Sequence, residues 1–290
     1  MRLDKSIFAV VGGDARQAAL ANFLAREGST VYCAGFEQSP HLLTGTASTD
    51  PLTAILMSDT VILPMPPTRD GKTLNAPLST YRVELNEDFC EALRGKAVFV
   101  GIAGKLRDVS PSYARLNLFD YYANESFLLR NAQATAEGAL AELIANVPRT
   151  ICGSRMLITG CGRITRCLAP MLRSLGANVA VAARKPSDQA WVQSQGMEAL
   201  TFRKAARRAK EFDIIVNTVP APVIDERFLE GVSEHAALLD LASLPGGIDL
   251  EACEKRGIQA WRALGLPGKY APLTAAEIIK DTVMLILEEG

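Results

Sequence analysis

Histidine is scarce in this chain, because only His41 and His235 occur among 290 residues. Chemistry that needs several imidazoles, such as a histidine-rich zinc site, is therefore nearly excluded, and we expect no metal site. Excess charge is also lacking, since 31 Lys and Arg residues balance 32 Asp and Glu residues and leave a net charge of −1. Without a basic field, neither nucleic acid nor an anionic membrane is expected as a partner.

Long apolar runs and paired cysteines are missing too. No apolar run approaches the roughly 20 residues that span a bilayer, and residues 1–13 lead into a strand-like segment rather than a signal cleavage site. The six cysteines form no C-x-x-C pair and mostly have apolar neighbours, which is typical of buried, reduced thiols. These absences predict a soluble, cytoplasmic protein.

What is present is one pattern that occurs twice. Residues 6–11 form an apolar run that ends in a glycine turn, followed by a helical stretch over 15–27 and a second strand at 29–35. Residues 154–159 begin the same succession, with a helical stretch to 175 and a strand at 177–183. Further continuous apolar runs, typical of strands buried on both faces, occur at 59–64, 96–101, 212–218 and 236–242. The pattern predicts an α/β protein with two doubly wound, Rossmann-like domains whose sheets are parallel.

The domain limits follow from the helical segments. We expect a substrate domain over residues 1–130 and a dinucleotide-binding domain over 131–272, which begins with an Ala-rich crossover helix at 131–147. The amphipathic segment 273–290 is expected to return to the first domain. Residues 64–82 form a long loop rich in Pro, Gly, Asn and Thr, and it is either a substrate-covering lid or a plain excursion.

The motif with the clearest chemistry is Gly160-Cys-Gly162-Arg163-Ile164-Thr165. The first glycine permits a tight turn, the second lets the backbone approach a pyrophosphate, and the amides at the start of the next helix bind phosphates. The third position normally holds Gly or Ala for close helix–strand packing, and here it holds threonine. The context favours nucleotide binding, with a merely structural turn as the alternative.

Cofactor choice should be set at the end of the next strand, where an acidic residue binds the adenosine ribose and an Arg can neutralise a 2′-phosphate. Arg184 and Lys185 stand there, Ser187 is a further donor, and no carboxylate occurs before Asp188. The pattern favours NADP, with NAD as the other cofactor that would fit. The alternative interpretation is a solvated pair of charges on an exposed turn.

Two further strand ends and one loop carry small or polar residues where ligands bind in open α/β sheets. We expect them to lie near the nicotinamide and its ribose: Asn217, Thr218, Val219 and Pro220; Leu241, Ala242 and Ser243; Gly265 and Pro267. Lys269, in the same loop as the last two, could bind a carboxylate or a phosphate.

The first domain has its own strand-to-helix turn, which contains Gly13, Asp14 and Arg16 but lacks the dinucleotide spacing. Helix N-terminal amides and a guanidinium would suit a substrate carboxylate. Gly104 and Lys269 complete the candidate substrate-binding set. The alternative is that Asp14 caps its own helix and Arg16 is a surface charge.

Six segments together resemble one family. VVGGDARQ (10–17), TAEG (135–138), GCGRITR (160–166), NTVP (217–220), DLASLPGG (240–247) and ALGLPGKYAPLTAAEI (263–278) are similar to the dipicolinate synthase A-subunit family over essentially the whole chain. That family carries glycine at the third glycine position, so Thr165 departs from its pattern.

The resemblance implies an activity and a setting. It implies oxidation of dihydrodipicolinate, formed from a hydroxylated tetrahydro precursor by loss of water, to dipicolinate on a branch of the lysine pathway during sporulation. It also implies NADP⁺ as oxidant, the flavoprotein-like B-subunit of dipicolinate synthase as partner, assembly as a homodimer or hetero-oligomer, and a location in the mother-cell cytoplasm.

The crossover segment supplies the candidate catalytic residues, which are Glu137 as a proton acceptor together with Asn131 and Thr135. Glu137 as a structural hydrogen-bond partner at the hinge is the alternative. The 2-hydroxyacid dehydrogenases place a catalytic histidine before the terminal helix, where this chain has Leu264-Gly-Leu-Pro-Gly268, so lactate-type chemistry is not expected. Two other functions stay open: a non-catalytic NADP-binding scaffold or sensor, and an NADP-dependent dehydrogenase of another cyclic imino or amino acid.

Overall fold

The computed structural model describes residues 6–39 and 44–289. The chain divides into two compact units, each folded around its own sheet. The first contains the described residues up to Asn131 and those from Pro267 onward, and the second comprises Ala132–Leu266. The second unit ends at Leu266, six residues before the limit expected from the sequence, because residues 267–271 belong to the first unit.

The first unit is built on a parallel six-stranded sheet with the order β3-β2-β1-β4-β5-β6. Its strands are β1 (Ile7–Val11), β2 (Thr30–Ala34), β3 (Ala47–Ser48), β4 (Thr60–Ile62), β5 (Ala97–Val100) and β6 (Leu118–Asp120). Its helices are α1 (Ala15–Arg26), α2 (Pro51–Leu56), α3 (Glu87–Leu93), α4 (Ala103–Arg107), α5 (Pro111–Ala114), the 3₁₀ turn η2 (Tyr121–Ala123) and α13 (Pro272–Glu289).

The second unit has a parallel six-stranded sheet with the order β12-β11-β10-β7-β8-β9. Its strands are β7 (Arg155–Thr159), β8 (Asn178–Ala182), β9 (Glu198–Leu200), β10 (Ile214–Asn217), β11 (Ala237–Asp240) and β12 (Gln259–Arg262). Its helices are α7 (Arg163–Ser174), α8 (Pro186–Ser194), α9 (Phe202–Arg207), η3 (Ala209–Glu211), α10 (Glu226–Leu229) and α11 (Leu250–Lys255). Helices α6 (Glu125–Asn146) and α12 (Leu266–Tyr270) carry the chain between the units.

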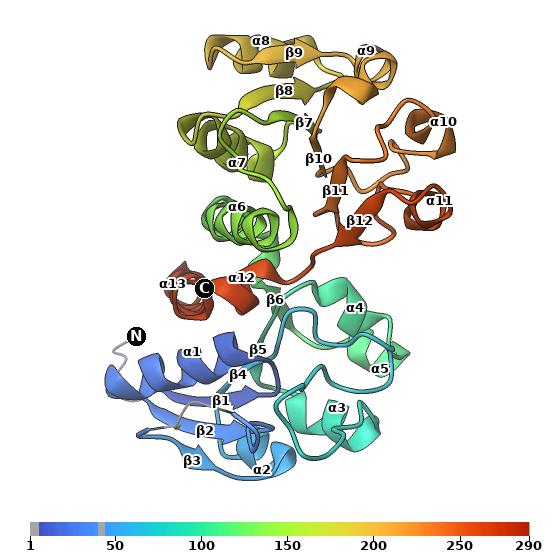
Figure 1. Cartoon of the computed structure of the whole chain (residues 1–290). Helices are drawn as coiled ribbons and strands as arrows, with labels where there is room; N and C mark the ends of the chain where they lie inside the picture. Colours follow the sequence, from blue (N-terminus) through green and yellow to red (C-terminus); the bar gives the residue numbers. More distant parts are fainter. Residues whose placement is uncertain (1–5, 40–43, 290) are drawn as a thin grey trace. The chain divides into compact units, whose positions relative to one another are not determined.

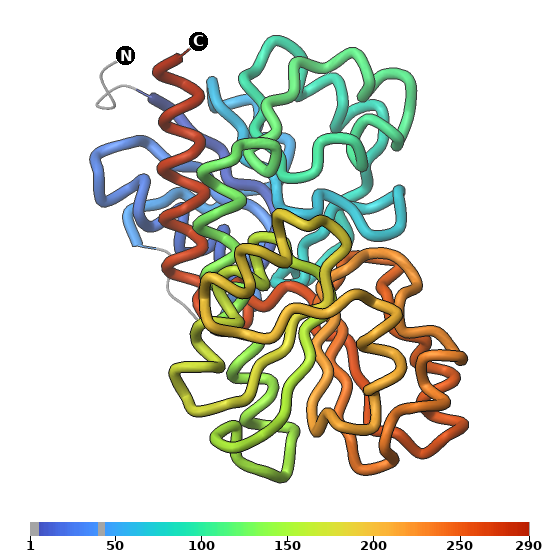
Figure 2. Tube along the Cα trace, turned by 90° about the horizontal axis from the view of Figure 1, so that it is seen from above, coloured from blue at the N-terminus to red at the C-terminus, as the bar shows by residue number. Residues whose placement is uncertain are grey.

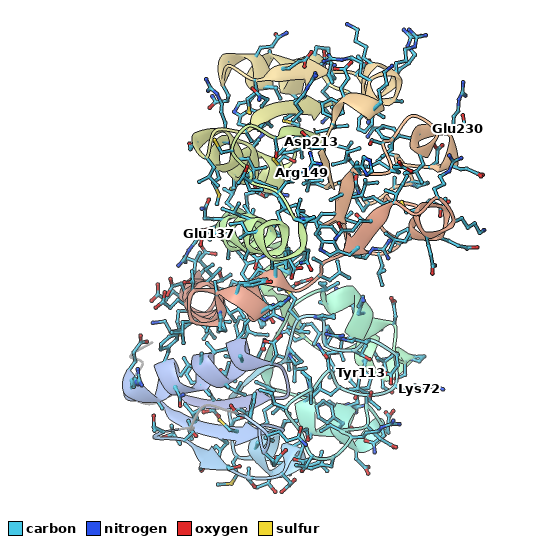
Figure 3. All side chains as sticks on the ribbon, viewed as in Figure 1. Lys72, Tyr113, Glu137, Arg149, Asp213 and Glu230 are labelled. Atoms are coloured by element: carbon cyan, nitrogen blue, oxygen red, sulfur yellow. The ribbon has the colours of Figure 1, made fainter. Side chains whose placement is uncertain are left out.

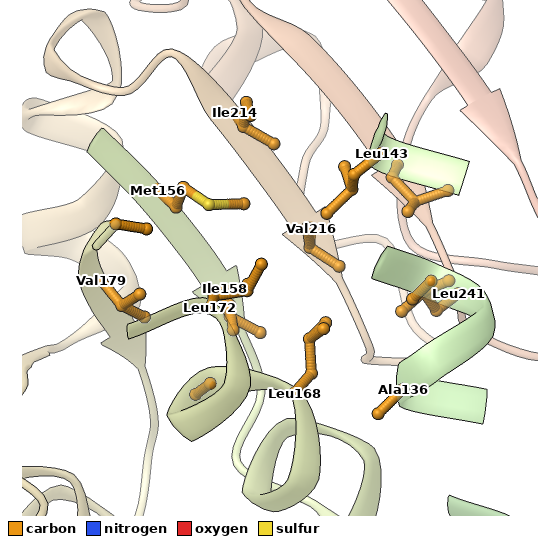
Figure 4. Packing of buried hydrophobic residues seen from close by; sticks show 14 of the residues in the cluster. Ala136, Leu143, Met156, Ile158, Leu168, Leu172, Val179, Ile214, Val216 and Leu241 are labelled. Atoms are coloured by element: carbon orange, nitrogen blue, oxygen red, sulfur yellow. The ribbon is translucent and has the colours of Figure 1, made fainter. Parts of the chain in front are cut away.

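Each sheet is buried on both faces, which explains the continuous apolar runs of its central strands. In the second unit, Met156 and Ile158 of β7 pack toward α6 and α7, whereas Leu157 packs toward α9, α10 and α11. Figure 4 shows the first of these cores, in which Leu143 of α6 and Leu168 of α7 meet the sheet. Each unit is therefore a three-layer α/β/α sandwich.

Both strand orders are those of the doubly wound dinucleotide-binding fold, so the expected fold class is confirmed (Figure 1). The terminal helix α13 packs along α1 in the first unit, as expected (Figures 1 and 2). Helix α6 begins at Glu125, earlier than expected from the Ala-rich run.

The long loop after β4 is packed against the first unit. Leu74 is 4% exposed, its backbone pairs with that of Thr68, and a Cβ on Gly12 would lie 2.7 Å from its Cδ2. The amide of Gly13 donates to the carbonyl of Asn75 at 2.9 Å. These contacts tie the loop to the β1–α1 turn, which favours the plain excursion over a lid.

The described cysteines are all free thiols, and Cys33, Cys90 and Cys253 are buried as expected, but Cys152 is exposed. Within the described ranges, none of the helices is both long enough and apolar enough to cross a membrane.

Candidate functional site

A cavity of about 780 Å³ lies at the carboxyl edge of the second sheet. It is bordered by the turns after β7 and β10, which are neighbouring strands whose following connections diverge, so it occupies the switch point where doubly wound sheets bind ligands. Its lining comprises Gly160, Cys161, Gly162, Ala183, Arg184, Lys185, Asp188, Thr201, Phe202, Thr218, Val219, Pro220, Ala221 and Val223. The structure thus brings together seven residues that the sequence nominated for cofactor binding.

The two glycines of the motif have different requirements. Gly160 has a φ of +92°, and a Cβ there would lie 2.6 Å from the hydroxyl oxygen of Thr218 and 2.8 Å from Val219 Cγ2. Gly162 caps α7 in an extended conformation, and a Cβ there would meet nothing within 4 Å. Gly160 is therefore needed by the turn itself, whereas Gly162 leaves open space at the helix N-terminus, where a pyrophosphate would bind.

Thr165 occupies the third position of the glycine motif, which normally holds Gly or Ala, and its side chain is packed into the domain. Its side chain is fully buried, and its hydroxyl lies 3.1 Å from that of Thr218. The Thr218 hydroxyl donates to the carbonyl of Thr159 at 2.8 Å. Two hydroxyls thus link α7, the turn after β10 and the end of β7, which compensates for the larger side chain.

Asn217 is the structural centre of a buried polar network. Its Nδ2 donates to Asp240 Oδ1 at 2.7 Å and to the carbonyl of Val219 at 3.0 Å, and its Oδ1 accepts from Thr159 Oγ1 at 2.7 Å. Asp240, which is fully buried, also forms an ion pair with Arg262 at 3.1 Å and accepts from the amide of Gly247. The Asn217 side chain therefore shapes the loops after β10 and β11 from within the domain.

Two cations, Arg184 and Lys185, border the cavity. Arg184 and Lys185 follow β8, both are exposed, and neither makes a side-chain hydrogen bond or ion pair with any residue that the structure describes. Ser187 is exposed in the first turn of α8 and is not part of the cavity wall. Asp188 does border the cavity, and its carboxylate pairs with Arg166 at 3.2 Å.

Seven lining residues were not nominated from the sequence, and Thr201, Phe202 and Val223 are three of them. Thr201 caps α9, Phe202 begins that helix, and Val223 lies in the loop after β10. Phe202 and Val223 add apolar surface to the cavity wall, which suits a flat base. The signal that leads to them is β9, a short edge strand whose carboxyl end positions Thr201 and Phe202.

Other nominated residues do not line this cavity. Arg163 and Ile164 are the first residues of α7, and Ile164 packs against the core. Leu241 and Ala242, which follow β11 in the sequence, are buried, and Ser243 is exposed. Gly265 has a φ of +69° ahead of α12, and Pro267 is the first residue assigned to the other unit.

In the first unit, the polar side chains of the turn after β1 bond to groups of the same turn. Asp14 accepts from the backbone of Arg16 and caps α1, with Gln17 completing a capping box, so the capping alternative for Asp14 is confirmed. Arg16 is only 5% exposed, so it is not the surface charge of the same alternative. Its Nε and Nη2 each donate to Asp14 at 2.8 Å, and Nη2 also donates to the carbonyl of Met65 at 3.0 Å.

The ion pair between Asp14 and Arg16 lowers the pKa of Asp14. Burial alone would raise the pKa of Asp14, but hydrogen bonds and the positive charge from Arg16 hold that pKa below its usual value. Gly268 of α12 covers the pair, since a Cβ there would lie 2.9 Å from Arg16 Nε. The guanidinium nominated for a substrate carboxylate is therefore largely engaged inside the first unit.

The remaining substrate candidates, Lys269 and Gly104, are both exposed. Lys269 is exposed, and its ammonium lies 4.8 Å from the ring centre of Tyr270. Gly104 is exposed in α4, next to Ile102, which adopts a φ of +65° that is unusual for a β-branched residue. The carboxylate of Asp120 holds this turn by accepting from the amides of Ile102 and Ala103.

The candidate catalytic residues occupy two faces of α6. Asn131 and Thr135 are one helical turn apart and share a face, whereas Glu137 lies about 200° around the helix from Thr135. Glu137 is exposed and accepts from Gln133 Nε2 at 2.9 Å (Figure 3). The structure therefore does not bring Glu137 to the face that carries Thr135.

Comparison with known proteins assigns each half of the chain. Residues 7–122 match the N-terminal domain of the dipicolinate synthase A-subunit, and residues 128–243 match the NAD-binding domain of D-isomer specific 2-hydroxyacid dehydrogenases. The dipicolinate synthase A-subunit of Bacillus subtilis (strain 168) is 31% identical over 286 residues, which cover 97% of this chain and 95% of that protein. The chain belongs to the dipicolinate synthase A-subunit family.

Solved structures agree with this assignment. The dipicolinate synthase A-subunit from Bacillus halodurans superposes with a TM-score of 0.89 at 30% identity and 98% coverage of both chains. The corresponding dipicolinate synthase structure from B. subtilis gives 0.84 at 30% identity, with 98% of this chain and 96% of that one covered. The second unit of this dipicolinate synthase A-subunit homologue is thus a nicotinamide dinucleotide-binding domain, which supports a dehydrogenase role.

Proposed function

We propose that the chain catalyses the NADP-dependent oxidation of dihydrodipicolinate to dipicolinate, together with the flavoprotein-like B-subunit. The single observation that carries the cofactor part is the cavity after β7, where Gly162 leaves room for a pyrophosphate and two cations, Arg184 and Lys185, have no ion-pair partner among the described residues. The substrate part rests on membership of the dipicolinate synthase A-subunit family.

The residues present fit NADP. The amides at the start of α7 would hold the pyrophosphate, Arg184 and Lys185 would hold a 2′-phosphate, and Phe202 and Val223 would contact the adenine. The dinucleotide, when bound, supplies the hydride acceptor. Thr218 and Asn217 keep the turn after β10 in place through their buried hydrogen bonds, so the chain contributes orientation more than acid–base chemistry.

The substrate carries two carboxylates, and the chain offers Lys269 as an exposed cation for one of them. Arg16 and Asp14 would set the backbone of the turn after β1, and Gly268, the residue before Lys269, packs against this pair. Oxidation removes one hydride and one proton from the ring. Glu137 is our candidate to accept the proton.

Reconstitution tests the proposal. The purified chain, the B-subunit, the hydroxylated tetrahydro precursor and NADP⁺ are mixed, and dipicolinate is measured by its absorbance. Dipicolinate that forms only when the chain and NADP⁺ are both present supports the proposal, and no dipicolinate under any cofactor condition contradicts it. Full activity of a Gly162→Asp complex would favour the non-catalytic scaffold instead, because an acidic side chain at Gly162 would repel the pyrophosphate.

A further inference from the structure

Asp188 and Trp191 lie one turn apart on the same face of α8, and both contact the side chain of Arg166 from α7. The carboxylate of Asp188 pairs with the Arg166 guanidinium at 3.2 Å, and the guanidinium carbon lies 5.2 Å from the ring centre of Trp191. The Asp188 side chain is 22% exposed, whereas that of Arg166 is 49% exposed. Arg166 is therefore held on one side by an ion pair and on the other by a cation–π contact.

Asp188 creates a difficulty for a site that is to hold NADP. Asp188 borders the same cavity as Arg184 and Lys185, and a carboxylate close to a 2′-phosphate is repulsive. It is also the type of residue that favours NAD, since a carboxylate after the second strand can accept from the adenosine ribose. Left unpaired, Asp188 would favour the dinucleotide without the phosphate.

Arg166 stands in the right place to cancel that charge. It pairs with Asp188 but is not part of the cavity wall, so it does not compete with Arg184 for the ligand. The two charges also oppose each other at the neighbouring thiol of Cys161. Burial and the charge of Asp188 raise the pKa of that thiol, and the charge of Arg166 counteracts them.

We propose that Arg166 is a specificity-determining residue that neutralises Asp188 and so lets the adenosine end of the cavity accept a phosphorylated ribose. The proposal rests on the proposed function for the class of ligand, a nicotinamide dinucleotide. In this proposal, NADP is accepted through two effects. Arg184 and Lys185 contact the ligand directly, and Arg166 acts indirectly by neutralising Asp188.

The test is the ratio of NADP⁺ to NAD⁺ affinity, measured by titration calorimetry on the full chain. Arg166→Met keeps an apolar stem against Trp191 and removes the charge, and it should lower the ratio on the order of tenfold relative to wild type. Arg166→Lys keeps the charge and should preserve the ratio. Asp188→Asn combined with Arg166→Met should restore the ratio to within about twofold of wild type, because the charge that Arg166 cancels is then gone.

Rescue by the double variant separates the proposal from a structural role. An Arg166→Met protein with the wild-type ratio overturns it, and so does a double variant whose ratio stays as low as that of Arg166→Met. The proposed function has a different readout, because NADP preference is judged from the wild-type ratio alone. Equal wild-type affinities for NADP⁺ and NAD⁺ would remove that preference, and the change in the ratio caused by Arg166→Met would still decide this inference. A wild-type chain that binds neither dinucleotide overturns both the proposed function and this inference.

Discussion

The hydroxyl of Thr165, at the start of α7, lies 3.1 Å from the hydroxyl of Thr218, in the turn after β10, and both belong to the cavity end of the second unit. The contact replaces the close approach that a glycine would give at position 165. It connects α7, whose first amides we propose as the phosphate site, to the turn on the other side of the switch point. The dinucleotide site is thereby stiffened by side chains rather than by backbone contact alone.

Removing this hydroxyl should therefore destabilise the domain. Thr165→Val keeps the side-chain volume but removes the hydrogen bond, and we expect the free energy of unfolding to fall by about 1 kcal/mol. Thr165→Ser keeps the hydroxyl and serves as the matched control for the hydrogen bond. Chemical denaturation measures both, and a Thr165→Val protein as stable as wild type would show that the hydroxyl contact is unimportant.

The two glycines of the motif should separate folding from binding. Gly160→Ala forces a Cβ toward Thr218 at a φ of +92°, so it should cost at least about 1 kcal/mol of stability. Gly162→Ala should fold with wild-type stability to within about 1 kcal/mol, yet lose dinucleotide affinity, because its Cβ occupies the space left for the pyrophosphate. Thermal unfolding and NADP titration distinguish the two, and equal behaviour of the variants in both assays would contradict the assignment.

Arg184 should set the preference for NADP. A charge-assisted contact to the 2′-phosphate is worth about 1.5–3 kcal/mol, so Arg184→Asp should lower the NADP:NAD affinity ratio by roughly tenfold or more. Arg256→Asp makes the same charge change on an exposed side chain outside the cavity, and it should leave the ratio unchanged. If Arg184→Asp and Arg256→Asp lowered the NADP:NAD affinity ratio equally, the effect would come from net charge and not from a contact at Arg184.

The Asp14–Arg16 pair should make stability depend on pH. The folded-state pKa of Asp14 lies below its unfolded value, so the ion pair contributes fully above that unfolded value, about 3.9, and the contribution is lost as pH falls through the folded pKa. Asp14→Asn keeps a good helix cap but removes the charge, and it should cost about 1–2 kcal/mol at neutral pH. Denaturation between acid and neutral pH should show this difference shrinking at low pH. A difference that does not vary with pH would contradict the ion-pair origin.

The proton acceptor is tested at α6. Glu137→Gln should lower turnover more than substrate affinity if the carboxylate accepts the ring proton, whereas Gln133→Ala removes only its hydrogen-bond partner and should have a smaller effect on turnover. Steady-state kinetics of the two-subunit enzyme measures both. Wild-type turnover in the Glu137→Gln enzyme would show that Glu137 does not accept the proton and would favour its structural role.

The central strands could be predicted from the sequence, because strands that are buried on both faces consist of continuous apolar residues. The edge strands β3, β6, β9 and β12 could not, because they are short and half-exposed, and β12 contains Gln259 and Arg262. Missing β9 also meant missing Phe202, which that strand positions at the cavity.

The site could be predicted where local sequence decides it and not where distant partners do. Gly160 and Arg184 were found because a turn and a strand end have characteristic residues. The setting of Arg16 could not be predicted, because the carbonyl that accepts from its guanidinium belongs to Met65, 49 residues away. Asn217 is not part of the cavity wall, and its side chain is engaged with Asp240, 23 residues further along the chain.

The central claim is that the hydride leaves the substrate for a dinucleotide held in this chain. The most direct measurement uses dihydrodipicolinate deuterated at the ring carbon that loses the hydride, with the two-subunit enzyme and NADP⁺, and analyses both products by mass spectrometry. We predict one NADPH carrying deuterium for each dipicolinate formed. Dipicolinate formed without labelled NADPH would contradict the account and assign the oxidation to the partner's flavin.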